Sequence, residues 1–225
     1  MIRPRLVLFD LDGTLMRCGR ASRRAYEEGL AALWPDDNGA DLLRGVPFAG
    51  RTDLGILAEL FAKTNRPFSP AALEKFWPPY LDALERWLVL EPPQVLAGAR
   101  EAPAALRARG IAAGLLTGNH YEGAMRKLRA GDCDAQLSWG GFGGDAQERA
   151  DLIPLALASA KAATGETFTA AETLIVGDTP LDIACARAHG ASVAVIPTGP
   201  HDEAELRSHQ PDIYLESLER LMDHF

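Results

Sequence analysis

The sequence lacks the features that mark disulfide-bonded, zinc-binding or membrane proteins. Its three cysteines, Cys18, Cys133 and Cys185, lie far apart and form no CxxC pair, which argues against a disulfide framework or a zinc site and fits a reducing cytoplasm. The five histidines show no HExxH spacing. No apolar run approaches membrane-spanning length, and the one after Met1 stops at Asp10, too early for a signal peptide. We therefore expect a cytoplasmic protein with no membrane partner.

An excess of positive charge is also missing. The 225 residues include 23 lysines and arginines against 31 aspartates and glutamates, which gives a net charge of −8. This balance argues against a nucleic-acid partner, and an anionic substrate would have to be attracted by local positive charge. A hydrophobic content of 47% is typical of a globular protein with one or two domains. The oligomeric state stays open, and we expect a monomer or a weak homodimer.

Short apolar runs that alternate with helical patterns predict a parallel sheet. Four runs without polar alternation, as expected for strands covered on both faces, span residues 6–9, 111–116, 173–176 and 192–196. A fifth and shorter run covers residues 213–215. Helical patterns over residues 99–109 and 180–189 each stop at a glycine, a common residue after a helix. This alternation predicts a doubly wound, Rossmann-like α/β core.

Residues 16–94 break this alternation, because they contain no convincing strand. Apolar side chains recur at helical spacing over residues 22–34, over 53–64 and from Pro70 onward. We therefore expect an all-helical domain inserted after the first strand. The predicted division is an α/β core of residues 1–15 and 95–225 and a helical insertion of residues 16–94.

Acidic and hydroxyl side chains follow three of the predicted strands. In chain order these positions and their neighbours are Asp10, Asp12, Thr117, Gly118, Asn119, Asp178 and Asp182. Ligands of open α/β sheets bind at the carboxyl ends of the strands, so we expect these side chains to converge there. Asp-x-Asp-Gly alone is also a common surface turn, but three unrelated turns do not explain the convergence. Neighbouring carboxylates repel each other, and a bound metal ion commonly offsets this repulsion.

These motifs resemble those of the haloacid dehalogenase-like superfamily, in its phosphoglycolate-phosphatase-like branch with a helical cap. DLDGTL at 10–15, LLTGN at 115–119 and VGDTPLDI at 176–183 occur in the order that the family shows. The helical interruption also falls where the family inserts its cap, and the resemblance covers nearly the whole chain. It implies an enzyme that hydrolyses small phosphorylated metabolites with Mg²⁺ as cofactor.

The resemblance also implies a role for each motif residue. Asp10 would be the nucleophile that forms an aspartyl-phosphate, and Asp12 the general acid that later activates water. Thr117 would hold a phosphate oxygen. Mg²⁺ would be bound by Asp10, the backbone carbonyl of Asp12 and Asp178, with Asp182 as a further contact, direct or through water.

Two other functions remain as alternatives, one from the same family and one from a different class. A phosphosugar mutase would return the phosphoryl group to a sugar, and a non-catalytic regulator would only bind a phosphorylated ligand. A dehalogenase is disfavoured, because a halide leaving group needs no proton and the acid Asp12 is present. The intact Asp10, Asp12 and Asp178 argue against the regulator.

One position departs from the family pattern. The lysine expected between the second and last motifs aligns with Arg149, counted back from Pro154. A guanidinium there could screen Asp10 and bind phosphate through two parallel hydrogen bonds; the alternative is an ordinary surface arginine. Lys127 and Lys161 are other candidates, but both fall within predicted helices, and we expect them to be solvated.

Substrate selection is expected to depend mostly on the cap. Arg51 could contact an anionic or hydroxyl group of the substrate, or it could be a solvated residue at a helix start. Gly118 and Asn119 are expected beside the substrate, and His120 at the rim without a catalytic task. The substrate itself stays open among phosphoglycolate, sugar phosphates and nucleotides.

Overall fold

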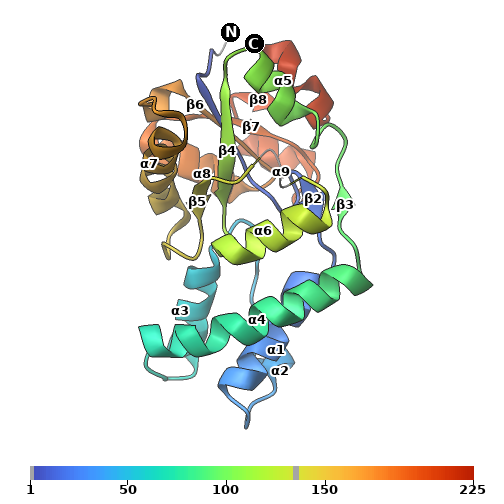
Figure 1. Ribbon diagram of the computed structural model, residues 1–225, viewed down its shortest axis with the longest axis vertical. Helices are drawn as coiled ribbons and strands as arrows, with labels where there is room; N and C mark the ends of the chain where they lie inside the picture. The colour runs from blue at the N-terminus through green and yellow to red at the C-terminus, as the bar shows by residue number, and fades with distance from the viewer. Residues whose placement is uncertain (1–2, 134–136) are drawn as a thin grey trace.

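A six-stranded parallel sheet forms the centre of the computed structural model, which describes residues 3–133 and 137–225 (Figure 1). The strand order is β5-β4-β1-β6-β7-β8, and every neighbouring pair is parallel. The strands are β1 (Leu6–Phe9), β4 (Ala112–Thr117), β5 (Gly140–Phe142), β6 (Thr173–Gly177), β7 (Ser192–Val195) and β8 (Ile213–Tyr214). The predicted α/β class is confirmed.

Helices cover both faces of this sheet, because its central strands are apolar on both. Side chains of β1 alternate in direction, so Leu6 and Leu8 belong to one buried cluster and Val7 and Phe9 to the other. The first cluster is covered by α7 (Leu152–Thr164), α8 (Pro180–His189) and α9 (Glu203–Ser208), and the second by α5 (Ala102–Ala108), α6 (Tyr121–Ala130) and the 3-10 helix η3 (Leu218–His224). Two further 3-10 turns, η1 (Arg149–Asp151) and η2 (Ala170–Glu172), precede α7 and β6.

The cap consists of four helices at the carboxyl end of the sheet, in the lower half of Figure 1. They are α1 (Ala21–Leu33), α2 (Gly39–Leu42), α3 (Asp53–Lys63) and α4 (Pro70–Leu90). The side chains of Thr52 and Ser69 accept hydrogen bonds from the first turns of α3 and α4, as expected of N-cap residues. Tyr26, Phe76 and Tyr80 form the fully buried aromatic centre between α1 and α4.

Two short strands join the cap to the core. The antiparallel pair β2 (Met16–Arg17) and β3 (Gln94–Val95) shows that the segment predicted to lack strands has one at each end. The predicted domain boundaries fall at this pair, and the division into two domains stays a prediction. Within the described ranges, no helix is both long enough and apolar enough to span a membrane.

The strand β5 was absent from the sequence prediction. Its sequence, Gly140-Gly141-Phe142, has none of the β-branched residues that favour strands. Glycine is required there because a β-carbon at Gly140 would lie 2.0 Å from the carbonyl oxygen of Leu115 on β4. Close backbone approach, which is a tertiary contact, therefore determines this strand.

The cap loop before α3 lies directly on the core. Asp53 N–H donates to the carbonyl of Gly118 (2.6 Å), and Leu54 N–H donates to that of Gly143 (2.9 Å). A β-carbon at Gly118 would lie 1.9 Å from the carbonyl oxygen of Arg51. Glycine at position 118 is thus what allows the cap backbone to reach the end of β4.

Gly118→Ala should therefore destabilise the protein. The added methyl group forces the cap loop away from β4, and such overpacking commonly costs about 1–3 kcal/mol. Gly123→Ala is the matched control, because its β-carbon would make only ordinary contacts, the nearest at 3.4 Å, and alanine favours a helix by up to about 1 kcal/mol. Urea unfolding measures both variants. Equal stability of the Gly118→Ala and Gly123→Ala variants would contradict the close approach of the cap loop to Gly118.

Candidate functional site

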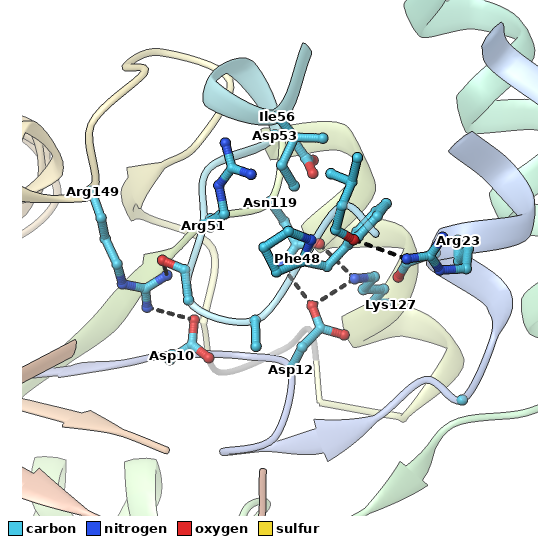
Figure 2. Close-up of a pocket in the computed structure, with 17 residues that line it drawn as sticks. Asp10, Asp12, Arg23, Phe48, Arg51, Asp53, Ile56, Asn119, Lys127 and Arg149 are labelled. Carbon is cyan, nitrogen blue, oxygen red and sulfur yellow. Dashed lines mark hydrogen bonds and ion pairs between the residues drawn. The ribbon is translucent and has the colours of Figure 1, made fainter. Parts of the chain in front are cut away.

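A pocket of about 330 Å³ lies between the carboxyl edge of the sheet and the cap (Figure 2). The core lines it with the loops after β1 and β4, with α6 and with η1, and the cap lines it with α1, with the loop before α3 and with the first turn of α3. The residues labelled in Figure 2 are Asp10, Asp12, Arg23, Phe48, Arg51, Asp53, Ile56, Asn119, Lys127 and Arg149. Most residues of the predicted site are therefore brought together in one place.

Asp10 and Arg149 form a buried ion pair on one side of this pocket. The Arg149 guanidinium donates through Nη2 to Asp10 Oδ1 (2.9 Å) and to Asp182 Oδ1 (2.5 Å). Its Nη1 donates to the carbonyl of Gly50 in the cap loop (3.2 Å). Only 7% of Arg149 is exposed, so it is not an ordinary surface arginine. The one position where the sequence departs from the family pattern thus places a cation beside Asp10.

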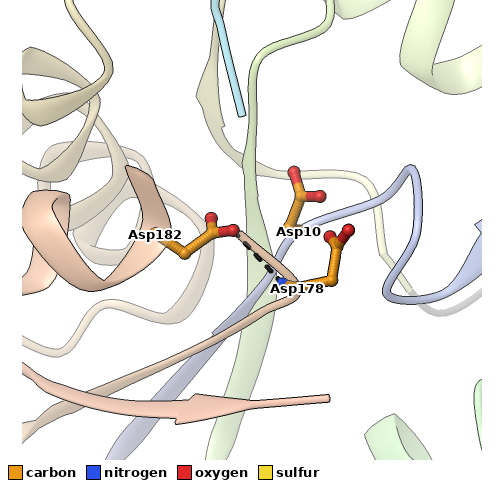
Figure 3. A group of neighbouring side chains, drawn as sticks. All are labelled: Asp10, Asp178 and Asp182. Atoms are coloured by element: carbon orange, nitrogen blue, oxygen red, sulfur yellow. Dashed lines mark hydrogen bonds between the residues drawn. The ribbon is translucent and has the colours of Figure 1, made fainter. Parts of the chain in front are cut away.

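Three carboxyl groups from two strand ends and one helix meet beside this pair. Asp10 follows β1, Asp178 follows β6 and Asp182 lies in the first turn of α8. Figure 3 shows the three groups turned toward one another, and their nearest oxygens all lie within 4.8 Å of one another. All three residues are buried. Within residues 3–133 and 137–225, this is the cluster of acidic, histidine or cysteine side chains that could hold a metal ion.

The charge of this cluster is not balanced by protein groups alone. Burial, and then the charges of Asp10 and Asp182, raise the pKa of Asp178 to about 9. Burial also raises the pKa of Asp10 to about 6, although Arg149 acts in the opposite direction. Both carboxylates therefore favour an additional cation. Mg²⁺ fits the site, since it prefers a few carboxylate oxygens and keeps several of its waters.

The carboxyl group of Asp178 packs against bare backbone on two sides. A β-carbon at Gly13 or at Gly199 would lie 2.2 Å or 1.8 Å from Asp178 Oδ2. Thr14 Oγ1 donates to Oδ1 (3.1 Å). The glycine of the first motif therefore provides room for the acid of the third.

Asp182 is held by protein groups at both of its oxygens. Its Oδ2 accepts from Thr179 N–H (3.0 Å), from the Thr179 hydroxyl (2.7 Å) and from Asp178 N–H (3.2 Å), which makes it part of the N-terminal capping box of α8. Its Oδ1 accepts from Arg149. Asp182 thus orients Arg149, and its predicted contact with a metal stays a prediction.

Asp12 belongs to a different network on the opposite side of the pocket. Its Oδ2 accepts from Asn119 Nδ2 (2.7 Å) and from Lys127 Nζ (2.6 Å). Asn119 Nδ2 also donates to Thr117 Oγ1 (2.7 Å). Burial alone would raise the pKa of Asp12, but the charge and hydrogen bond of Lys127, together with hydrogen bonds from Asn119 and Cys18, outweigh it and lower that pKa.

The prediction that Lys127 is solvated was wrong. Its side chain is 1% exposed, whereas Lys161 is exposed as predicted. The available signal was the helical stripe of α6, where Lys127 follows Gly123 and Ala124 by four and three residues on the buried face. A lysine inside such a stripe requires a buried partner.

Cap residues complete the site. Arg51 lines the pocket, but its Nη1 pairs with Glu59 Oε2 (2.6 Å), and its contact with a substrate stays a prediction. Asp53, not singled out from the sequence, accepts from Tyr26 Oη (2.8 Å) and from His120 N–H (2.7 Å). Burial raises the pKa of Asp53 to about 6. This carboxyl group therefore ties the cap to the loop that follows Thr117.

The His120 ring lies against the cap. It stacks on Trp77 of α4 with 4.4 Å between ring centroids. Together with the backbone contact to Asp53, this places His120 between core and cap and outside the acidic cluster.

Comparisons with known proteins agree with this architecture. A family model described as haloacid dehalogenase-like hydrolase matches residues 4–190. The phosphoglycolate phosphatase of Rhodospirillum rubrum is 33% identical in an alignment of length 220, and the match covers 87% of this chain and 80% of the relative.

Solved structures share the fold. A hydrolase from Pseudomonas syringae superposes with a TM-score of 0.69 at 22% identity, covering 99% of this chain and 97% of that one. CbbY from Rhodobacter sphaeroides, in complex with phosphate, superposes with a TM-score of 0.67 at 18% identity, covering 97% and 96% of the two chains.

The raised pKa of Asp178 predicts how stability depends on pH. In chelator, the folded protein holds this proton up to about pH 9, whereas an unfolded aspartate releases it near 3.8. Each rise in pH within this window therefore stabilises the unfolded state relative to the folded state. The melting temperature should fall from pH 5 to pH 9. Mg²⁺ should raise it most at the alkaline end, because the metal binds the ionised form.

Asp178→Asn should flatten this pH dependence and remove most of the stabilisation by Mg²⁺. Asp223→Asn, at an exposed position, is the control and should leave both unchanged. A melting temperature that rises between pH 5 and pH 9 in chelator would contradict the conclusion that protein groups alone do not balance the charge of the three carboxylates.

Proposed function

Because the chain belongs to the haloacid dehalogenase-like hydrolases and is an enzyme of the phosphatase type, we propose that it hydrolyses small phosphorylated metabolites through an aspartyl-phosphate on Asp10. The observation that carries the proposal is the pairing of a buried Asp10 with Arg149 beside an acidic cluster, at a pocket that also contains Asp12. A pocket of about 330 Å³ beneath the cap supports a small substrate. The protein would act in the cytoplasm, as a monomer or weak homodimer.

Asp10 would attack the phosphorus atom and form the acyl-phosphate bond while the ester oxygen leaves. Arg149 holds Asp10 Oδ1 in place, and its guanidinium would neutralise charge that grows on the phosphoryl oxygens. Asp182 supports this role, because its capping-box position fixes the far side of the same guanidinium.

Mg²⁺ would be held by Asp10, Asp178 and the backbone carbonyl of Asp12, with Asp182 nearby. When bound, it would offset the repulsion between the anionic nucleophile and the anionic phosphate. The raised pKa of Asp178 supports this assignment, because the protein alone leaves that carboxyl group short of positive charge.

Asp12 would donate a proton to the leaving oxygen and then take one from the water that hydrolyses the acyl-phosphate. Its side chain is 39% exposed, which supports contact with substrate in the pocket. The Thr117 hydroxyl accepts from the Asn119 amide, so its own hydrogen remains to donate to a phosphate oxygen.

The direct test is hydrolysis of an aryl phosphate with Mg²⁺ and with excess chelator, followed by a panel of phosphorylated metabolites. Chelator should abolish turnover. Asp10→Asn should abolish both turnover and acid-stable phosphoenzyme labelling, since the nucleophile is gone. Full activity in chelator, or in Asp10→Asn, would refute the mechanism, and transfer to a sugar hydroxyl instead of water would identify a mutase.

Arg149→Ala should lower the rate about a hundredfold or more. The variant loses a charge-assisted contact that strengthens in the transition state, and such contacts are commonly worth about 3–4 kcal/mol. Arg149→Lys should recover part of the loss, because the charge returns without the planar fork. Steady-state hydrolysis at saturating Mg²⁺ measures this, with a melting curve for each variant.

The matched control is Lys161→Ala, which removes an exposed cation from α7. It should hydrolyse at the wild-type rate. Wild-type turnover by Arg149→Ala would assign the phosphate contact to another cation.

A further inference from the structure

Lys127 is a buried cation that the mechanism above does not use. It lies in the last turn of α6, and its ammonium group reaches the pocket from the side opposite Arg149 (Figure 2). Its Nζ donates to Asp12 Oδ2 (2.6 Å) and to Asn119 Oδ1 (2.5 Å). Burying an ammonium group is costly, and a well-packed apolar side chain of similar size is often at least as stable. Stability alone therefore gives little reason for a lysine here.

The contacts of Lys127 form a closed ring with Asp12 and Asn119. Lys127 donates to both of them, and Asn119 Nδ2 donates to the same oxygen of Asp12 (2.7 Å). An ammonium group can only donate, so it fixes the Asn119 amide with its oxygen toward Lys127. The amide nitrogen is then directed to Asp12 and to Thr117 Oγ1 (2.7 Å).

The same ring determines which oxygen of Asp12 is held. Both contacts fall on Oδ2, so Oδ1 is the oxygen that the ring does not hold. The Asp12 side chain is 39% exposed, and it also has a hydrogen bond with Cys18. One lysine thus sets the orientation of Asp12 directly and that of Asn119 beside Thr117.

We propose that Lys127 is a positioning residue that holds Asp12 in the orientation needed to protonate the leaving oxygen. The inference rests on the proposed function, because it assumes that Asp12 is the general acid. Lys127 acts through Asp12 and Asn119 and need not touch the substrate. Its charge lowers the pKa of Asp12 and so opposes protonation of that carboxyl group, which means that its contribution to the acid step is orientation alone. Its loss should therefore matter most for substrates whose leaving group requires a proton.

The test compares kcat/KM for an alkyl phosphate, whose leaving oxygen needs protonation, with that for p-nitrophenyl phosphate, which needs little. Lys127→Met should lower kcat/KM about tenfold or more for the alkyl ester and no more than about threefold for the nitrophenyl ester. Lys127→Gln keeps a hydrogen-bond donor without the charge, and should retain part of the alkyl-ester activity. Arg129→Met removes an exposed cation from the same helix and should match the wild type on both.

A double-mutant cycle separates positioning from general damage. In an Asp12→Asn background, Lys127→Met should change neither ester by more than about twofold, because residues that act as a unit are not additive. Equal losses for the two esters in both Lys127 variants, or losses that add to those of Asp12→Asn, would overturn the inference.

The two proposals fail differently. A wild-type protein that hydrolyses neither ester would refute the proposed function itself. An Asp12→Asn variant that keeps wild-type activity on the alkyl ester would refute the general-acid step on which the positioning role rests. A wild type whose alkyl-ester activity depends on Asp12 but not on Lys127 would refute only the positioning role.

Discussion

The constraint on which the site depends is the burial of three carboxylates against one guanidinium. Asp10, Asp178 and Asp182 come together within 4.8 Å, and only Arg149 is paired with them among the described residues. Removing charges from water is costly unless opposite charges compensate. The surplus of negative charge favours a cation in the site, and the proposed Mg²⁺ would in turn favour the binding of a phosphate.

The parallel sheet itself brings two of these carboxylates together. The ends of β1 and β6 are neighbours in the sheet, so Asp10 and Asp178 meet there, with Gly13 and Gly199 leaving room for the Asp178 carboxyl group. The cap then closes the site through backbone contacts that depend on Gly118, and Arg149 also bonds to the cap at Gly50. The cation beside the nucleophile is therefore linked to the position of the cap.

The two sides of the pocket divide the chemistry. Arg149 and the acidic cluster lie beside Asp10, where phosphoryl transfer is proposed, whereas Lys127 and Asn119 hold Asp12, where proton transfer is proposed. Each carboxylate of the first motif thus has its own cation. This separation allows two acids only two residues apart to have different roles.

Much of this could be predicted from the sequence, because periodicity and motif order are local signals. The strand before Asp10 followed from its apolar run, whereas Arg149 was a candidate because of the resemblance to the family, with a surface arginine as the alternative. The burial of Lys127 and the contact of Asp53 with His120 were not predicted, because both depend on contacts between segments far apart in the sequence. For Lys127, the apolar stripe of α6 was the one local signal.

A crystal structure with Mg²⁺ and beryllium fluoride, which mimics a phosphoryl group on aspartate, tests the central claim most directly. The account predicts the fluoride adduct on Asp10, contacted by Arg149, with one metal ion between Asp10 and Asp178. An adduct on another carboxylate, or a metal bound away from this cluster, would contradict it.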